Sequence, residues 1–254
     1  MYLLHNGQRI KTEDFSFSLQ NRSFLYGDGF FDTLRVENGK IPWLEFHFER
    51  WKNSCSAMGI PSPFGKSEWE SLIFTILESD TARVRTHLWS GNGVQYGNRN
   101  DAEYLIQVFP WEKQVHVELR GGIFFEDRLT HNRFHWMKLN AAFFYSQMEK
   151  TALKMGWSEG ILLNTSGELV EGCHSALFWK RQGQWFTHPN GADGIWSTAK
   201  AAALKLGNPE GERVIEGRLH HSEINLVTEW AMGNALQPWA PFSLWQDGNL
   251  GTRL

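Results

Sequence analysis

The most informative stretch of the chain is GELVEGCHSALFW, residues Gly167 to Trp179. Turn residues open it, and apolar side chains then alternate as they do in a half-buried strand. One acid, Glu171, lies inside this run between Val170 and Gly172. A carboxylate at such a position needs a cationic partner. A lysine from another segment, or a protonated nitrogen of a cofactor, would supply one.

Lys138 is a candidate for chemistry because it follows the aromatic-rich stretch FHWM at 134–137. An amine held in an apolar site loses its proton more readily and becomes a usable nucleophile, which forms a Schiff base with an aldehyde. A carboxylate such as Glu171 favours the protonated form of a nearby pyridine nitrogen. An ordinary lysine at a strand end and an ion-paired strand acid produce the same local patterns, so these two residues alone do not decide the function.

Composition and charge exclude several classes of protein. The formal net charge is −3, so no basic face for nucleic acid is expected. Cys55 and Cys173 match no metal-ligand spacing, so we expect no metal site. A disulfide between them stays open, and a reduced pair in the cytoplasm is favoured. Residues 1–14 lack a charged leader with a long apolar core, and no apolar run approaches the roughly 20 residues of a membrane span.

Apolar periodicity and turn residues predict a chain of mixed helices and strands. We expect an α+β protein of two domains with a cleft between them: a smaller domain over 1–110, a connection at 111–114 and a larger domain over 115–254. After an N-terminal hairpin (1–10) and a strand ending at 36, helices are expected at 45–58, 67–77, 141–155 and 198–206, and strands at 82–89, 104–109, 115–125, 160–163, 169–171, 175–180, 185–187, 212–216 and 229–232.

Two further segments suit a phosphate group. Arg50 lies on the helix at 45–58, where its forked cation would reach a phosphate; His47 shares that face and is a packed histidine in the simpler interpretation. The sequence GIWST at 194–198 precedes an alanine-rich helix, whose N-terminus offers free backbone N–H groups. Ser197 or Thr198 would equally serve as a plain N-cap there.

Taken together, these segments resemble the class IV (fold type IV) pyridoxal-phosphate enzymes, which include branched-chain and D-amino acid aminotransferases and 4-amino-4-deoxychorismate lyase. The motifs follow one another in the family's order from the first half of the chain to its end. They are YGDGFFDTLRV (26–36), LEFHFERW (44–51), Lys138, GELVEGCHSALFW, GADGIWST (191–198) and NALQPWAPF (234–242). The resemblance implies a D-amino acid aminotransferase-like architecture, with pyridoxal 5′-phosphate in the interdomain cleft, and a homodimer.

The resemblance also implies a role for each matching residue. Lys138 stands where the family has its Schiff-base lysine, 18 residues before Gly156. Arg50 matches the phosphate-binding arginine, and Glu171 matches the residue that pairs with the pyridine nitrogen. The backbone N–H groups of Ile195 and Trp196 match the phosphate-binding turn.

Four positions depart from the family's pattern. Ala176 stands where the family usually has Asn, and Ser197 and Ser90 stand where it usually has arginines. The family's Asn three residues after the lysine is replaced by Ala141, with Asn140 one position early. The departures leave the cofactor residues in place and put the reaction in doubt.

Within the family, GCHSALFW and MGNALQP resemble the lyase, which acts in folate synthesis and converts 4-amino-4-deoxychorismate to 4-aminobenzoate and pyruvate. The chain is also short for a branched-chain aminotransferase. An aminotransferase of the branched-chain or D-amino acid type remains open, with Lys138 as the proton carrier. So does a cofactor-binding homologue with reduced activity, because of Ser90, Ala176 and Ser197, and so does an interaction domain without a cofactor. In each enzyme the substrate is a small amino compound.

Overall fold

The computed structural model describes residues 1–97, 101–113 and 119–245. Within it the chain forms two compact units. The first comprises Met1–Lys113 together with Met137–Ala142, and the second comprises Gln114–Trp136 and Phe143–Leu254. Both units combine helices with a sheet, so the expected α+β class is confirmed.

The short segment Met137–Ala142 belongs to the first unit, although the sequence places it within the larger domain. Leu139 forms an antiparallel bridge with Phe30, and the Phe31 N–H donates to the Lys138 carbonyl at 2.9 Å. This pairing adds the segment to the edge of the first sheet. Local sequence patterns do not reveal it, because its partner lies more than a hundred positions earlier in the chain.

The first unit is built on an antiparallel sheet of order β2-β1-β5-β4-β3. Asn6 and Gly7 have φ of 49° and 81°, the backbone that a two-residue hairpin needs, and so join β1 to β2 as the sequence predicts. The strands are β1 (Tyr2–His5), β2 (Gln8–Lys11), β3 (Gly29–Val36), β4 (Ala82–Trp89) and β5 (Glu103–Phe109).

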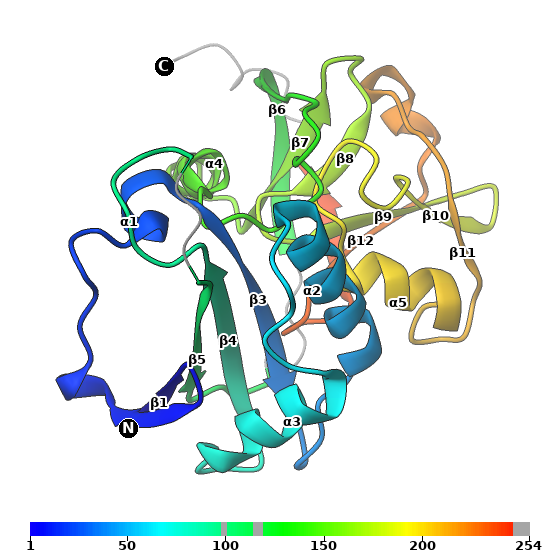
Figure 1. Ribbon diagram of the computed structural model, residues 1–254. Coiled ribbons are helices and arrows are strands. Elements are labelled where there is room, and N and C mark those ends of the chain that lie inside the picture. The colour runs from blue at the N-terminus through cyan, green and yellow to red at the C-terminus, as the bar shows by residue number, and fades with distance from the viewer. Residues whose placement is uncertain (98–100, 114–118, 246–254) are drawn as a thin grey trace. The chain divides into compact units, whose positions relative to one another are not determined.

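Helices α2 (Leu44–Met58) and α3 (Lys66–Thr75) cover one face of this sheet, and α2 packs on both β3 and α3 (Figure 1). Gly59 follows the last residue of α2 with φ of 67°, so the helix ends at 58, where the sequence predicts its end. Their buried faces meet in an aromatic core, in which Trp51 and Trp69 have ring centroids 5.1 Å apart. A 3-10 turn (Thr12–Asp14) and the short helix α1 (Arg22–Tyr26) complete the unit; the sequence predicts neither of them.

The second unit contains an eight-stranded sheet of order β11-β10-β9-β12-β13-β6-β7-β8. An additional pairing of Glu171 in β8 with Ala176 in β9 closes six of these strands into a ring. The strands are β6 (Leu119–Leu129), β7 (Glu159–Asn164), β8 (Leu169–Gly172), β9 (Ala176–Arg181), β10 (Gln184–Thr187), β11 (Val214–Glu216), β12 (Glu229–Gly233) and β13 (Ala240–Leu244).

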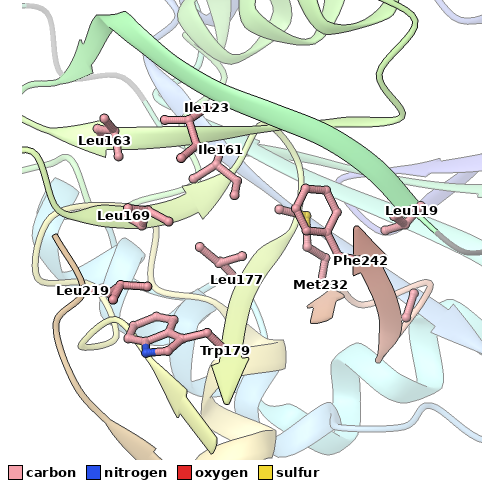
Figure 2. Packing of buried hydrophobic residues seen from close by; sticks show 11 residues of the cluster. Leu119, Ile123, Ile161, Leu163, Leu169, Leu177, Trp179, Leu219, Met232 and Phe242 are labelled. Atoms are coloured by element: carbon pink, nitrogen blue, oxygen red, sulfur yellow. The ribbon is translucent and has the colours of Figure 1, made fainter. Parts of the chain in front are cut away.

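Figure 2 shows the apolar core of this ring, where strands distant in sequence bring their side chains together. Ile161 of β7 and Leu177 of β9 are fully buried there, with Trp179 and Leu219 beside them. Helix α4 (Phe143–Lys154) packs on β7, helix α5 (Thr198–Leu206) packs on β11, and a 3-10 helix (His221–Leu226) precedes β12.

Most predicted elements of the second unit are confirmed, and α5 has the predicted bounds. The strand predicted at 115–125 is found as β6, although 115–118 lie outside the described residues. Strand β13 is not predicted, because Pro241 interrupts its pattern. Among the described residues, no helix is both long and apolar enough to cross a membrane.

Candidate active site

Glu171 is a buried carboxylate of the second unit, only 4% exposed. The Tyr145 hydroxyl donates to its Oε1 at 2.6 Å, and the Ile195 N–H approaches its two oxygens at 3.1 and 3.2 Å. Burial and the charge of Glu171 raise the pKa of Tyr145 well above its ordinary value, so the phenol keeps its proton and donates. A carboxylate buried in this way favours a positively charged group beside it. It is therefore chemically suited to a protonated ring nitrogen.

Gly194 makes the approach of Glu171 to the turn before α5 possible. A Cβ at this position would lie 2.5 Å from the Glu171 Oε1 atom, which is far inside van der Waals contact. The turn thus brings its backbone against the carboxylate because residue 194 has no side chain.

The two backbone groups expected to bind phosphate have other partners here. The Ile195 N–H donates to Glu171, and the Trp196 N–H donates to the Trp136 carbonyl at 2.8 Å. A phosphate contact through either group would replace one of these bonds, and the phosphate-binding role of the two N–H groups stays a prediction. Ser197 is the N-cap of α5 and accepts from the Lys200 N–H at 3.3 Å, as the plain-cap interpretation predicts.

A cluster of charged side chains contacts the turn before α5 through Asp193. Asp193 accepts from the Arg218 guanidinium at 3.0 Å, and the Nε2 atom of His188 lies 3.1 Å from the Asp193 carboxylate. With Glu168, these side chains have the composition of a metal site, but the Arg218 Nη1 atom contacts all three and already supplies the positive charge. Burial and the charge of Lys200 lower the pKa of His188 to about 4, so its ring is neutral near pH 7.

Arg50 lies in the first unit, where it binds the carboxylate of Asp32. The sequence does not predict this pairing. Asp32 of β3 accepts from the Arg50 Nε at 3.1 Å and Nη2 at 2.7 Å, and from the His47 Nδ1 at 2.7 Å. Asp28 is not paired with Asp32; it binds Arg22 instead. The fork of Asp32 fixes the plane of the Arg50 guanidinium, as a phosphate-binding arginine requires.

Lys138 is positioned by the backbone pairing of its own segment with β3. Its Nζ lies 5.0 Å from the centroid of the Phe31 ring. Two residues later, Asn140 donates its N–H to the Gly29 carbonyl at 2.9 Å, and its side chain contacts His87 at 3.2 Å. The lysine therefore stands on a segment fixed on both sides, which suits a residue that must present its amine repeatedly in one place.

Two other departures from the family's pattern have structural partners. Ser90 donates to the Asp28 carboxylate at 3.0 Å. Ala141 packs closely against Gly27: a Cβ added to Gly27 would lie 2.6 Å from the Ala141 Cβ. A larger side chain at position 141 would therefore be crowded on this side.

The structure brings Glu171 and Ile195 into contact in the second unit and places Lys138 and Arg50 in the first. Sequence reasoning misses Tyr145 because it lies in an ordinary helical pattern. It also misses Arg83 and Arg85. The sequence does contain a signal for them, because charged residues at every second position of the strand predicted at 82–89 lie on one face of the sheet.

A family model, amino-transferase class IV, matches residues 29–245. The chain belongs to this family. Class IV enzymes use pyridoxal phosphate, so the chain is a pyridoxal-phosphate-dependent enzyme of the aminotransferase or lyase type. The family identified by resemblance and the cofactor that it implies are thereby confirmed.

Curated and solved class IV relatives are distant in sequence. The aminodeoxychorismate lyase of Vibrio harveyi is 23% identical over 239 residues, 89% of this chain and 86% of that protein. The D-alanine aminotransferase of Bacillus licheniformis is 22% identical over 198 residues, 74% and 69% of the two chains. The branched-chain aminotransferase of Thermoproteus uzoniensis, solved with norvaline, has a TM-score of 0.87 at 20% identity, covering 98% of this chain and 88% of that one. This likeness establishes the fold type IV architecture.

Proposed function

We propose that this class IV enzyme is a lyase that converts 4-amino-4-deoxychorismate to 4-aminobenzoate and pyruvate. Support comes from the lyase relative, which matches over nearly its whole length, and from Cys173 two residues after Glu171, as in the lyase form of the motif. The proposal includes a homodimer in the cytoplasm.

The residues present fit the cofactor, and each has a proposed task. When bound, pyridoxal phosphate supplies an aldehyde for imine formation and a ring that withdraws electrons. Lys138 provides the amine that holds it and, once displaced, carries a proton at Nζ. Glu171 holds the proton of the ring nitrogen, and Arg50 binds the phosphate. The backbone N–H groups of Ile195 and Trp196 would contact the phosphate in exchange for their present bonds.

The observation that carries the proposal of a carboxylate-bearing substrate is a pair of arginines, Arg83 and Arg85, on one face of the first sheet. Arg85 and His87 of β4 lie opposite Thr33 and Phe31 of β3, so they share a face. The Arg85 guanidinium lies 4.2 Å from the Phe31 centroid. The Lys138 Nζ lies 5.0 Å from the same centroid. The Phe31 ring therefore contacts both the Arg85 guanidinium and the Lys138 amine, which places these two groups near each other.

Arg83 and Arg85 have no anionic partner in the part of the chain that the structure describes. Their Nε atoms are buried and make no hydrogen bond. Burial lowers the pKa of Arg85, and the positive charge of Arg83 lowers it further. Neighbouring cations without a counter-charge favour an anionic ligand.

The proposed substrate has the matching charge. Its two products, 4-aminobenzoate and pyruvate, each carry one carboxylate, so the substrate carries two. One of these groups can pair with Arg85 while the amino group reaches the cofactor at Lys138. A bidentate guanidinium–carboxylate contact fixes orientation as well as charge.

An aminotransferase of the branched-chain or D-amino acid type is the second candidate. The Bacillus relative and the solved branched-chain enzyme favour it, and an amino acid also presents a carboxylate to Arg85. Both reactions begin with the same amine exchange at Lys138, so the cofactor residues do not separate them.

Release of pyruvate without a keto-acid acceptor separates the two reactions. The yellow holoenzyme is incubated with 4-amino-4-deoxychorismate alone, and pyruvate and 4-aminobenzoate are measured together. We expect both in equal amounts, and none from Lys138→Ala. Amino transfer to a keto acid without pyruvate release would instead establish the aminotransferase. A coloured protein inactive in both assays would be the homologue with reduced activity.

The role of Arg85 is tested in the same assay. Arg85→Gln should raise KM by about tenfold or more, the equivalent of at least about 1.4 kcal/mol of binding. Arg120→Gln removes an exposed arginine of the second unit and serves as the matched control. An unchanged KM in Arg85→Gln would remove this residue from the substrate site.

A further inference from the structure

Lys200, on the first turn of α5, is a buried charge that the proposed chemistry does not use. Its side chain is among the largest that are fully buried, with 1% of the residue exposed. A fully buried lysine is rare, because removing an ammonium group from water costs several kcal/mol unless close partners compensate.

The surroundings of Lys200 compensate only in part. Its Nζ donates to the Val170 carbonyl at 3.0 Å, and no carboxylate among the described residues comes within 4 Å of it. Thus one of three N–H donors has a protein acceptor. A methionine would fill much of the same volume without the charge, so packing alone does not explain a lysine here.

The charged groups around Lys200 come from three directions. Glu171 lies on β8, next to Val170, whose carbonyl accepts the hydrogen bond from Lys200. Asp193 lies in the turn before α5, and Glu216 ends β11. Burial lowers the pKa of Lys200, and the negative charges of Glu171, Glu216 and Asp193 offset only part of that shift. His188 is a further titratable neighbour, and its ring is neutral near pH 7.

We propose that Lys200 is a positioning residue for Glu171: its ammonium holds the β8 backbone at Val170 and sets a positive charge behind the carboxylate. The inference rests on the proposed role of Glu171 toward the ring nitrogen. A proton shared by the two can lie on the nitrogen or on the carboxylate. The positive charge of Lys200 near the carboxylate favours the proton on the ring nitrogen, because Glu171 is then negatively charged. That arrangement makes the ring a stronger electron sink.

The test compares the pH dependence of the visible absorbance of the bound cofactor in four holoproteins: wild type, Lys200→Met, Lys200→Arg and Lys205→Met. Removal of a nearby positive charge raises proton affinity, so Lys200→Met should move the transition upward by on the order of one pH unit. Lys200→Arg should restore it. Lys205 is exposed on the same helix, and its substitution should leave the profile unchanged.

Thermal unfolding of the cofactor-free proteins provides a second measurement. A buried cation without a close carboxylate destabilises the fold, so Lys200→Met should melt at the same temperature as wild type or higher. A lower melting temperature together with an unchanged absorbance profile would show a purely structural lysine and overturn the inference. If Lys200→Met does not fold, Lys200→Gln takes its place in both measurements.

Glu171→Gln separates failure of this inference from failure of the proposed site. If Glu171→Gln shifts the absorbance profile and Lys200→Met does not, Lys200 has no role toward Glu171, whereas the cofactor site stands. If neither substitution shifts the profile, Glu171 does not face the ring nitrogen, and both proposals are overturned.

Discussion

Asp32 is the residue whose replacement tests the interior of the first unit most sharply. Its side chain is 2% exposed and accepts hydrogen bonds from Arg50 and His47. Asp32→Asn keeps the shape of the side chain but removes the negative charge that Asp32 places against the buried Arg50. Loss of one partner from a buried ion pair costs about 3–5 kcal/mol, because the other charge stays buried.

The pH dependence provides an independent estimate of the same interaction. Burial alone would raise the pKa of Asp32, but the charges of Arg50 and His47 and their hydrogen bonds bring it from 3.8 to about 2. Because the folded state has the lower pKa, its stabilising contribution is complete above about pH 5 and is lost as pH falls toward 2. The difference of about two pH units corresponds to about 2 kcal/mol.

Urea unfolding of the cofactor-free protein, followed by circular dichroism, measures both quantities. At pH 7 we expect Asp32→Asn to lower the free energy of unfolding by about 3–5 kcal/mol. Asp14→Asn, at an exposed acid, should stay within about 0.5 kcal/mol of wild type. Between pH 5 and pH 2, wild type should lose about 2 kcal/mol more than Asp32→Asn. A loss below about 1 kcal/mol at pH 7, or equal losses on acidification, would refute the reasoning.

Two other substitutions test single contacts. Gly194→Ala should displace the Glu171 carboxylate, because its new Cβ would come within 2.5–2.9 Å of that group. Equilibrium dialysis should then show cofactor retention weakened by about tenfold or more. The control is Gly65→Ala, where no atom lies within 4 Å of the added Cβ, and this variant should retain cofactor normally. Thr86→Val removes the acceptor of the buried Trp69 Nε1 at 3.1 Å, and urea unfolding should show a loss of about 1–3 kcal/mol; no loss would mean that this hydrogen bond does not contribute.

Local patterns predict the parts of the fold that local physics determines. The apolar spacing of α2 and Gly59 after it fix that helix, and Ser197 caps α5 as its residue type favours. The hairpin at Asn6 and Gly7 follows from turn chemistry in the same way.

The pairings that the sequence does not predict are all non-local. Asp32 meets Arg50 because β3 and α2 pack together, and no spacing rule relates the two positions. Tyr145 reaches Glu171 from a helix whose pattern specifies only its apolar face. Lys200 lies in an alanine-rich helix whose sequence does not indicate which side is buried.

The central claim is that Lys138 holds the cofactor. Borohydride reduction of the yellow holoprotein, followed by proteolysis and mass spectrometry, tests it directly. We predict that the mass of the reduced cofactor is found on the peptide that contains Lys138, and that Lys138→Ala carries no label. Label on the buried Lys200 or on any other lysine, or colour that survives in Lys138→Ala, would contradict the claim.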